Sequence, residues 1–162
     1  MTRLDAAWQQ ALGAEHQAVF GYSLLGPWLT GSDQQLAVAC SDAHEALRDA
    51  TADQLARAGL TPAAPAADYP ALYPVADGAA ARRLAIRLED ACAAAWRYVY
   101  LQAASRPTAD ASGGTATSPA AARVAGDVRE TAQSALTASA VRGARWRVLV
   151  TPTHPTTAFP GV

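Results

Sequence analysis

The chain has 162 residues, a formal net charge of −1, and 51% hydrophobic residues that include only two phenylalanines. This length suffices for one domain with a sizeable core but is short for two domains. The near-neutral charge provides no basic face for nucleic acid, and no segment is apolar enough to span a membrane or resembles a secretory leader. Alanine is abundant and strand-forming runs are missing, so the composition predicts an all-α protein.

The first predicted helix covers residues 4–25. Thr2 and Asp5 are spaced as a capping pair at its start, and Gly26-Pro27 marks its end. Because only a few residues, 26–32, separate it from the next helix, we expect the two to be antiparallel neighbours.

The second predicted helix covers residues 33–58. Ser32 is placed as its N-cap, Gln35 completes a capping box, and Gly59 with Leu60 is typical of a glycine C-cap. The long segment that follows, residues 60–77, contains four prolines: Pro62, Pro65, Pro70 and Pro74. At about 3.3 Å per extended residue it can cross the full length of a helix, so we expect a strap that connects the second and third helices along the bundle.

The third predicted helix covers residues 78–104, with Asp77 as its N-cap. Residues 106–118 contain no large apolar side chain and predict a solvated loop. The fourth helix is expected to begin at Ser118-Pro119, to continue to about Arg142 and to fray toward Trp146.

Residues 1–150 are therefore expected to form one bundle, and residues 151–162 an extended tail. Trp146, Leu149 and Phe159 are costly to leave in water, so we expect this region to pack on the bundle or on a second subunit. Cys40 and Cys92 lack the spacing of a zinc or redox motif, and we expect both to be reduced core residues of a cytoplasmic protein.

A carboxylate interrupts the apolar stripe of the first helix. Trp8, Leu12, Val19 and Tyr22 follow the spacing of one helical face, and Glu15 occupies the position between Leu12 and Val19. The other helices also have ionisable residues near their midpoints, which in a bundle of similar helices lie at one height: His44, Glu45, Glu89 and Glu130. Bundle proteins hold two metal ions in such a layer.

Several segments resemble an actinobacterial ferritin-like domain family of unknown function. They are GAEHQAVFGY, AHEALRDATADQLARAG, the YPALYP of the strap, Glu89, the Ala-rich closing helix that ends at Trp146, and AFPG in the tail. The resemblance implies a ferritin-like fold, which agrees with the four-helix bundle and the one long proline-rich crossover between the second and third helices that the strap predicts. It also implies a cytoplasmic protein and a homodimer, and it brings no established activity.

The two-metal pattern of ferritin-like bundles requires Glu from two helices and a Glu-x-x-His pair from each of the other two. His44, His16 and His154 each lack an acidic residue three positions earlier. The sequence thus predicts a metal-free centre in which Glu15, His44, Arg48 and Glu89 form a buried polar network, with Arg48 as the guanidinium that meets Glu15. Glu130 lies one position off the apolar series of its helix and is the weakest member of the layer.

Two other arrangements remain open. Glu15, His44, Glu45 and Glu89 are the residues that would bind iron or manganese in a metal-dependent oxidoreductase. Tyr22, Tyr69, Tyr73 and Trp96 would line a pocket for an unidentified small molecule. The preferred hypothesis is a non-catalytic binding or assembly module without a cofactor.

Overall fold

The structure, a computed structural model, describes residues 2–105, 119–156 and 160–161. It contains four α-helices: α1 (Arg3–Leu25), α2 (Gly31–Arg57), α3 (Gly78–Ala104) and α4 (Pro119–Val150). Two short 3₁₀ helices, η1 (Gly26–Trp28) and η2 (Pro70–Leu72), lie in the connections, and the described residues form no strand. The all-α prediction is confirmed. None of the described helices combines the length and hydropathy that a membrane crossing requires.

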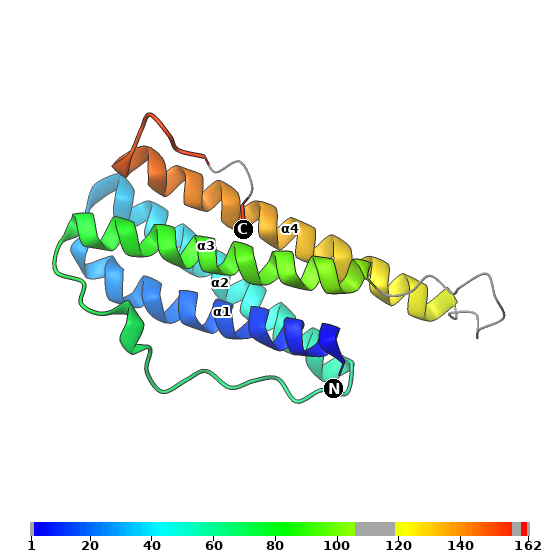
Figure 1. The fold of residues 1–162 in the computed structure, drawn as a ribbon. Helices are drawn as coiled ribbons and strands as arrows, with labels where there is room; N and C mark the ends of the chain where they lie inside the picture. The colour runs from blue at the N-terminus through cyan, green and yellow to red at the C-terminus, as the bar shows by residue number, and fades with distance from the viewer. Residues whose placement is uncertain (1, 106–118, 157–159, 162) are drawn as a thin grey trace.

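The helices form a bundle with one long crossover (Figure 1). Helix α2 runs back along α1, and the strap then returns along the outside of the bundle to the end where α3 begins. Helices α2 and α3 therefore run in the same direction, and α4 runs antiparallel to α3. This is the crossover arrangement that the length of the strap predicts.

The strap is attached to α1 by polar side chains. The Gln9 side chain donates to the Thr61 carbonyl and accepts from the Ala63 backbone N–H, both at 2.8 Å. His16 Nε2 lies 3.0 Å from the Ala63 carbonyl oxygen. Farther along, the Tyr69 ring packs on Phe20 with ring centroids 5.2 Å apart. These contacts hold the strap against α1.

Most of the predicted helix ends are confirmed. Thr2 and Asp5 form a reciprocal capping box, and Asp77 accepts from the Ala80 N–H at 2.6 Å. Gly59 has a φ of +76°, a conformation that glycine adopts without steric cost. The start of α2 was predicted wrongly: its N-cap is Thr30, no side chain caps it, and Ser32 lies inside the helix.

Helix α4 extends beyond its predicted end at Arg142 and continues to Val150. Trp146 is completely buried inside the bundle as part of this helix, so packing stabilises the turns that were expected to fray. Leu149, in contrast, remains 43% exposed. In the tail, Gly161 (φ +81°) passes so close to the Ala93 carbonyl that an added Cβ would lie 2.7 Å from its oxygen. Ser118, Phe159 and the predicted loop at 106–118 fall outside the described residues.

The core consists of two apolar clusters along the bundle axis. One includes Leu12, Leu55 and Trp96, and the other includes Leu25, Leu84 and Trp146. Fully buried polar side chains lie between them: Glu15, His44, Glu89 and Ser139. The structure thus places a polar layer midway along an otherwise apolar interior.

Candidate functional site

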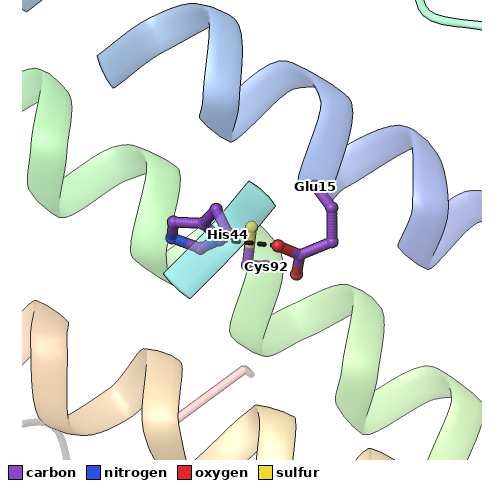
Figure 2. A group of neighbouring side chains, drawn as sticks. All are labelled: Glu15, His44 and Cys92. Carbon is purple, nitrogen blue, oxygen red and sulfur yellow. Dashed lines mark hydrogen bonds and ion pairs between the residues drawn. The ribbon is translucent and has the colours of Figure 1, made fainter. Parts of the chain in front are cut away.

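Glu15 is the carboxylate on the apolar stripe of α1, and its side chain is completely buried. Its Oε2 lies 2.6 Å from His44 Nδ1 on α2, and its Oε1 accepts from Trp96 Nε1 on α3 at 2.7 Å. Figure 2 shows Glu15 and His44 approaching one another from α1 and α2 beside Cys92 of α3. Each Glu15 oxygen therefore has its own hydrogen-bond partner.

Glu89 of α3 occupies the other side of His44 and is also completely buried. Its Oε1 lies 3.1 Å from His44 Nε2 and accepts from the Tyr22 hydroxyl at 2.7 Å. Arg142 Nε on α4 donates to Oε1 at 3.1 Å and to Oε2 at 3.0 Å. Both His44 ring nitrogens thus meet a carboxylate, and the network joins all four helices.

Two further hydrogen bonds orient the Tyr22 and Arg142 side chains. Trp146 Nε1 donates to the Tyr22 hydroxyl oxygen at 2.9 Å, and an Arg142 terminal nitrogen donates to Ser139 Oγ at 3.1 Å. The Tyr22 ring also stacks on the His44 ring, with centroids 5.6 Å apart. We call Glu15, Tyr22, His44, Glu89, Trp96, Ser139, Arg142 and Trp146 the central network.

The charges of the central network cancel. Burial alone would lower the pKa of His44, but hydrogen bonds to Glu15 and Glu89 and the charges of both carboxylates raise this pKa to about 9. His44 is therefore an imidazolium at neutral pH, with both N–H groups donating. Two carboxylates then face one imidazolium and one guanidinium, a net charge of zero. Such pairing is what makes buried charges tolerable.

Tyr22 and Arg142 keep their ordinary protonation states. Burial and the neighbouring Glu89 charge raise the pKa of Tyr22 well above its usual value, so the phenol remains a hydrogen-bond donor. Burial opposes the charged form of Arg142, but the Glu89 carboxylate outweighs it and raises the pKa of the guanidinium. Each group thus presents a donor to Glu89.

Cys92 adds a possible metal ligand to this layer. Single ligand atoms of Glu15, His44 and Cys92 lie within 4.8 Å of one another (Figure 2). A metal, however, requires a thiolate and an unprotonated imidazole nitrogen. Burial and the charges of Glu15 and Glu89 raise the pKa of Cys92 well above its usual value, and its thiol contacts the Ala14 carbonyl oxygen at 3.6 Å. In the ion-free protein the Cys92 thiol and the His44 ring therefore hold protons that a bound metal would have to displace.

Arg48 does not join the network, contrary to the sequence prediction. Its Nε donates to the adjacent Asp49 at 2.8 Å, and its side chain is 26% exposed. That neighbour raises the pKa of Arg48, and the guanidinium in turn lowers the pKa of Asp49. Glu45 and Glu130 are also exposed, so neither faces the centre. Of the predicted residues, the structure brings together Glu15, His44 and Glu89.

The four aromatic residues of the predicted pocket do not converge. Tyr22 and Trp96 are buried parts of the central network. Tyr69 packs on the outer side of α1 against Phe20, and Tyr73 is 48% exposed. The first pair thus belongs to the buried network and the second to the strap and its contacts with Phe20.

The sequence interpretation missed Arg142, Ser139 and Trp146. A signal for them exists in α4, where positions 128, 132, 135, 139, 142 and 146 alternate spacings of four and three. The structure buries Val128, Ala132, Ala135, Ser139 and Trp146 on this stripe. The predicted apolar series of this helix was Val124, Val128, Thr131, Ala135 and Ala138. It ended there, although its next member is Arg142, and it did not include Ser139 or Trp146.

The chain is similar in structure to a crystallised conserved hypothetical protein, rv2844, from Mycobacterium tuberculosis. The two share 29% sequence identity with a TM-score of 0.73, over 91% of this chain and 96% of the other. Among proteins with curated functions, none matches this sequence. Residues 7–126 match the family model of a domain of unknown function, DUF4439. Because this match spans most of the sequence, the chain belongs to the DUF4439 family.

Proposed function

We propose that this protein is a non-catalytic binding or assembly module of the ferritin-like type, built around a metal-free polar centre. The single crossover between α2 and α3 supports the ferritin-like assignment. The proposal includes a homodimer in the cytoplasm of an actinobacterium, for which the two free buried cysteines suit a reducing compartment.

The charge balance of the central network carries this proposal. A di-metal centre needs carboxylates with free oxygens and histidines with an unprotonated nitrogen. Here all four oxygens of Glu15 and Glu89 accept hydrogen bonds from the chain, and both His44 nitrogens face carboxylates. Arg142 supplies the second positive charge that a metal would otherwise contribute.

The apolar surface at one end of the bundle supports self-association. Trp28 at the end of η1 is 46% exposed, and Val148, Leu149 and Val150 at the end of α4 are also exposed. Both segments lie at the same end of the bundle in Figure 1. Exposed large apolar residues of this kind are typical of interaction surfaces.

Metal analysis of protein purified without chelator tests the metal-free centre. We expect iron and manganese far below one equivalent per chain, unchanged in Glu15→Ala. Near-stoichiometric iron or manganese in the wild type that is lost in Glu15→Ala would overturn the proposal.

Nitrogen NMR of the His44 ring tests the same point without relying on metal content. At pH 7 we expect both ring nitrogens to be protonated, with the resonance assigned by its loss in His44→Gln. A single unprotonated nitrogen at this pH would contradict the charge balance described above.

The competing function is a metal-dependent oxidoreductase, and one observation favours it. Glu15, His44 and Cys92 lie close enough to share an ion. Metal binding there would displace a proton from His44, so the two measurements above distinguish this function from the proposed one.

Sedimentation tests the assembly role. We expect the wild type to sediment as a dimer and Leu149→Ser to shift it toward monomer, with the exposed Leu101→Ser on α3 as the matched control. A strict monomer at high concentration would exclude the homodimer.

A further inference from the structure

Helices α2 and α4 are less closely packed than the other neighbouring pairs. The close backbone contacts join α1 with α2, α1 with α3, and α3 with α4. Two hollows lie on the surface between α2 and α4, where these helices are farther apart.

One of these hollows, which we call the cationic groove, has a volume of about 330 Å³. It is lined by Leu36, Ala39 and Ala43 of α2 and by Val141, Arg142 and Arg145 of α4. Apart from the Cys40 thiol, its uncharged lining residues are aliphatic, and both of its charged lining residues are arginines. A volume near 300 Å³ lies at the lower end of the range for small-molecule sites.

Donors remain available at this groove. Arg142 uses Nε and one terminal nitrogen for Glu89 and Ser139, whereas its other terminal nitrogen has no partner among the described residues. Arg145 is exposed, and it forms no ion pair with any acidic residue in the part of the chain that the structure describes. A guanidinium binds a carboxylate through paired N–H donors, so an anion would satisfy both side chains.

The second hollow between the same two helices has acidic instead of basic lining residues. It has a volume of about 460 Å³, and its lining includes Asp127 and Glu130 together with Leu47, without any basic residue. The same two helices therefore present a basic groove and an acidic groove. This segregation favours an anion at the first hollow and repels it from the second.

We propose that the cationic groove binds an aliphatic carboxylate of medium chain length, with the carboxylate on Arg142 and Arg145 and the chain along the alanine-lined walls. This inference deepens the binding role in the proposed function and rests on it. The ion pair with Glu89 holds Arg142 in position, so one of the two arginines that would contact the carboxylate is already oriented before the ligand binds.

Calorimetric titration with decanoate tests the head group. We expect saturable binding to the wild type, and binding about five- to tenfold weaker in Arg145→Gln because one charged contact is lost. Arg83→Gln removes an arginine on α3 that is also exposed, and it serves as the matched control, with unchanged binding. Equal weakening in both variants, or equal binding of decanol, would overturn the proposal.

Filling the groove tests the position of the chain. Ala39→Phe places a ring in the hollow and is expected to weaken decanoate binding at least tenfold. Ala46→Phe, two turns farther along α2 and also exposed, is the control that retains binding. If Ala39→Phe binds decanoate as the wild type does, the ligand lies elsewhere and the proposal fails.

Sedimentation of Arg145→Gln and Ala39→Phe tests whether a second copy of this chain occupies the groove in place of decanoate. If decanoate does not bind and Ala39→Phe converts a dimer to a monomer, a second copy of this chain fills the groove and the proposal is wrong. Neither variant alters the central network, so absence of decanoate binding with a metal-free centre would reject this ligand and leave the charge-balanced centre standing. Stoichiometric metal would instead reject the proposed function.

Discussion

His44 and Arg48 lie one turn apart on α2, yet they have opposite environments. His44 is completely buried between Glu15 and Glu89 and connects α2 to two other helices. Among the described residues, Arg48 forms an ion pair with the adjacent Asp49 alone, whose side chain is 69% exposed. The first pair of contacts links distant parts of the chain, and the second is local.

The difference shows why the two cations contribute unequally to stability. Water and salt screen an exposed pair, which contributes about 0–1 kcal/mol. A buried ion, in contrast, cannot lose its partner without leaving an uncompensated charge in the core. We therefore expect substitutions at the two positions to differ severalfold in their effect on the free energy of unfolding.

The largest effect is expected for His44→Leu. This change leaves Glu15 and Glu89 in the core without the imidazolium between them, and it should lower the free energy of unfolding by about 3–5 kcal/mol. Urea unfolding followed by circular dichroism measures the loss. A loss below that of an exposed substitution would show that the buried layer is not charge-coupled.

The next largest effect separates charge from hydrogen bonding at Glu15. Glu15→Leu removes the partner of Trp96 and one of the two carboxylate partners of His44, and about 3 kcal/mol should be lost. Glu15→Gln retains an acceptor oxygen, so the loss should be nearer 1–2 kcal/mol. Unfolding of the two variants under identical conditions checks the order, and equal losses would rule out the contribution of the retained acceptor.

A smaller effect is expected for Trp96→Phe. The ring volume is largely retained, but Glu15 Oε1 loses the indole donor at 2.7 Å. The expected loss is about 1–2 kcal/mol. Adding His44→Leu as a second change gives a double-mutant cycle, in which simple additivity would contradict a shared network.

The pH dependence of the free energy of unfolding tests the contribution of the His44 charge in the unsubstituted protein. The pKa of His44 rises from 6.5 in the unfolded chain to about 9 in the folded protein, so the folded state holds more protons between these values. The stabilisation is complete below pH 6.5 and disappears as the pH rises through 9. The free energy of unfolding of the wild type, measured with urea, should therefore fall as the pH rises across this window. That of His44→Gln should change less with pH.

The smallest effect is expected for Arg48→Gln. Its pair with Asp49 is exposed, so the free energy of unfolding should change by less than about 0.5 kcal/mol. The change should also shrink in high salt. A loss comparable to that of His44→Leu would mean that Arg48 reaches the centre in solution.

Much of the fold could be predicted from local signals. Cap residues such as Thr2 and Asp77, and the length and prolines of the strap, determine where helices start and which way they run. The end of α4 could not be predicted in this way, because Trp146 is stabilised by contacts with residues far away in the sequence. Local propensity does not contain that information.

The candidate site was predictable only in part for a related reason. Glu15 was visible because it interrupts an apolar stripe, and the shared mid-height pointed to His44 and Glu89. The partner of the carboxylates depends instead on how each helix is rotated about its axis. Arg48 and Arg142 both carry the right chemistry, and each lies three or four residues from buried positions of its helix. The spacing alone therefore does not tell which of the two points inward.

The central network also determines how far each helix can slide along its neighbours. The bundle interfaces contain many alanines, so a helix displaced by one turn, about 5.4 Å, would meet a similarly small surface. The same displacement would carry Glu15 out of reach of both His44 and Trp96. The buried charges thus select a single vertical alignment among several that packing alone would tolerate.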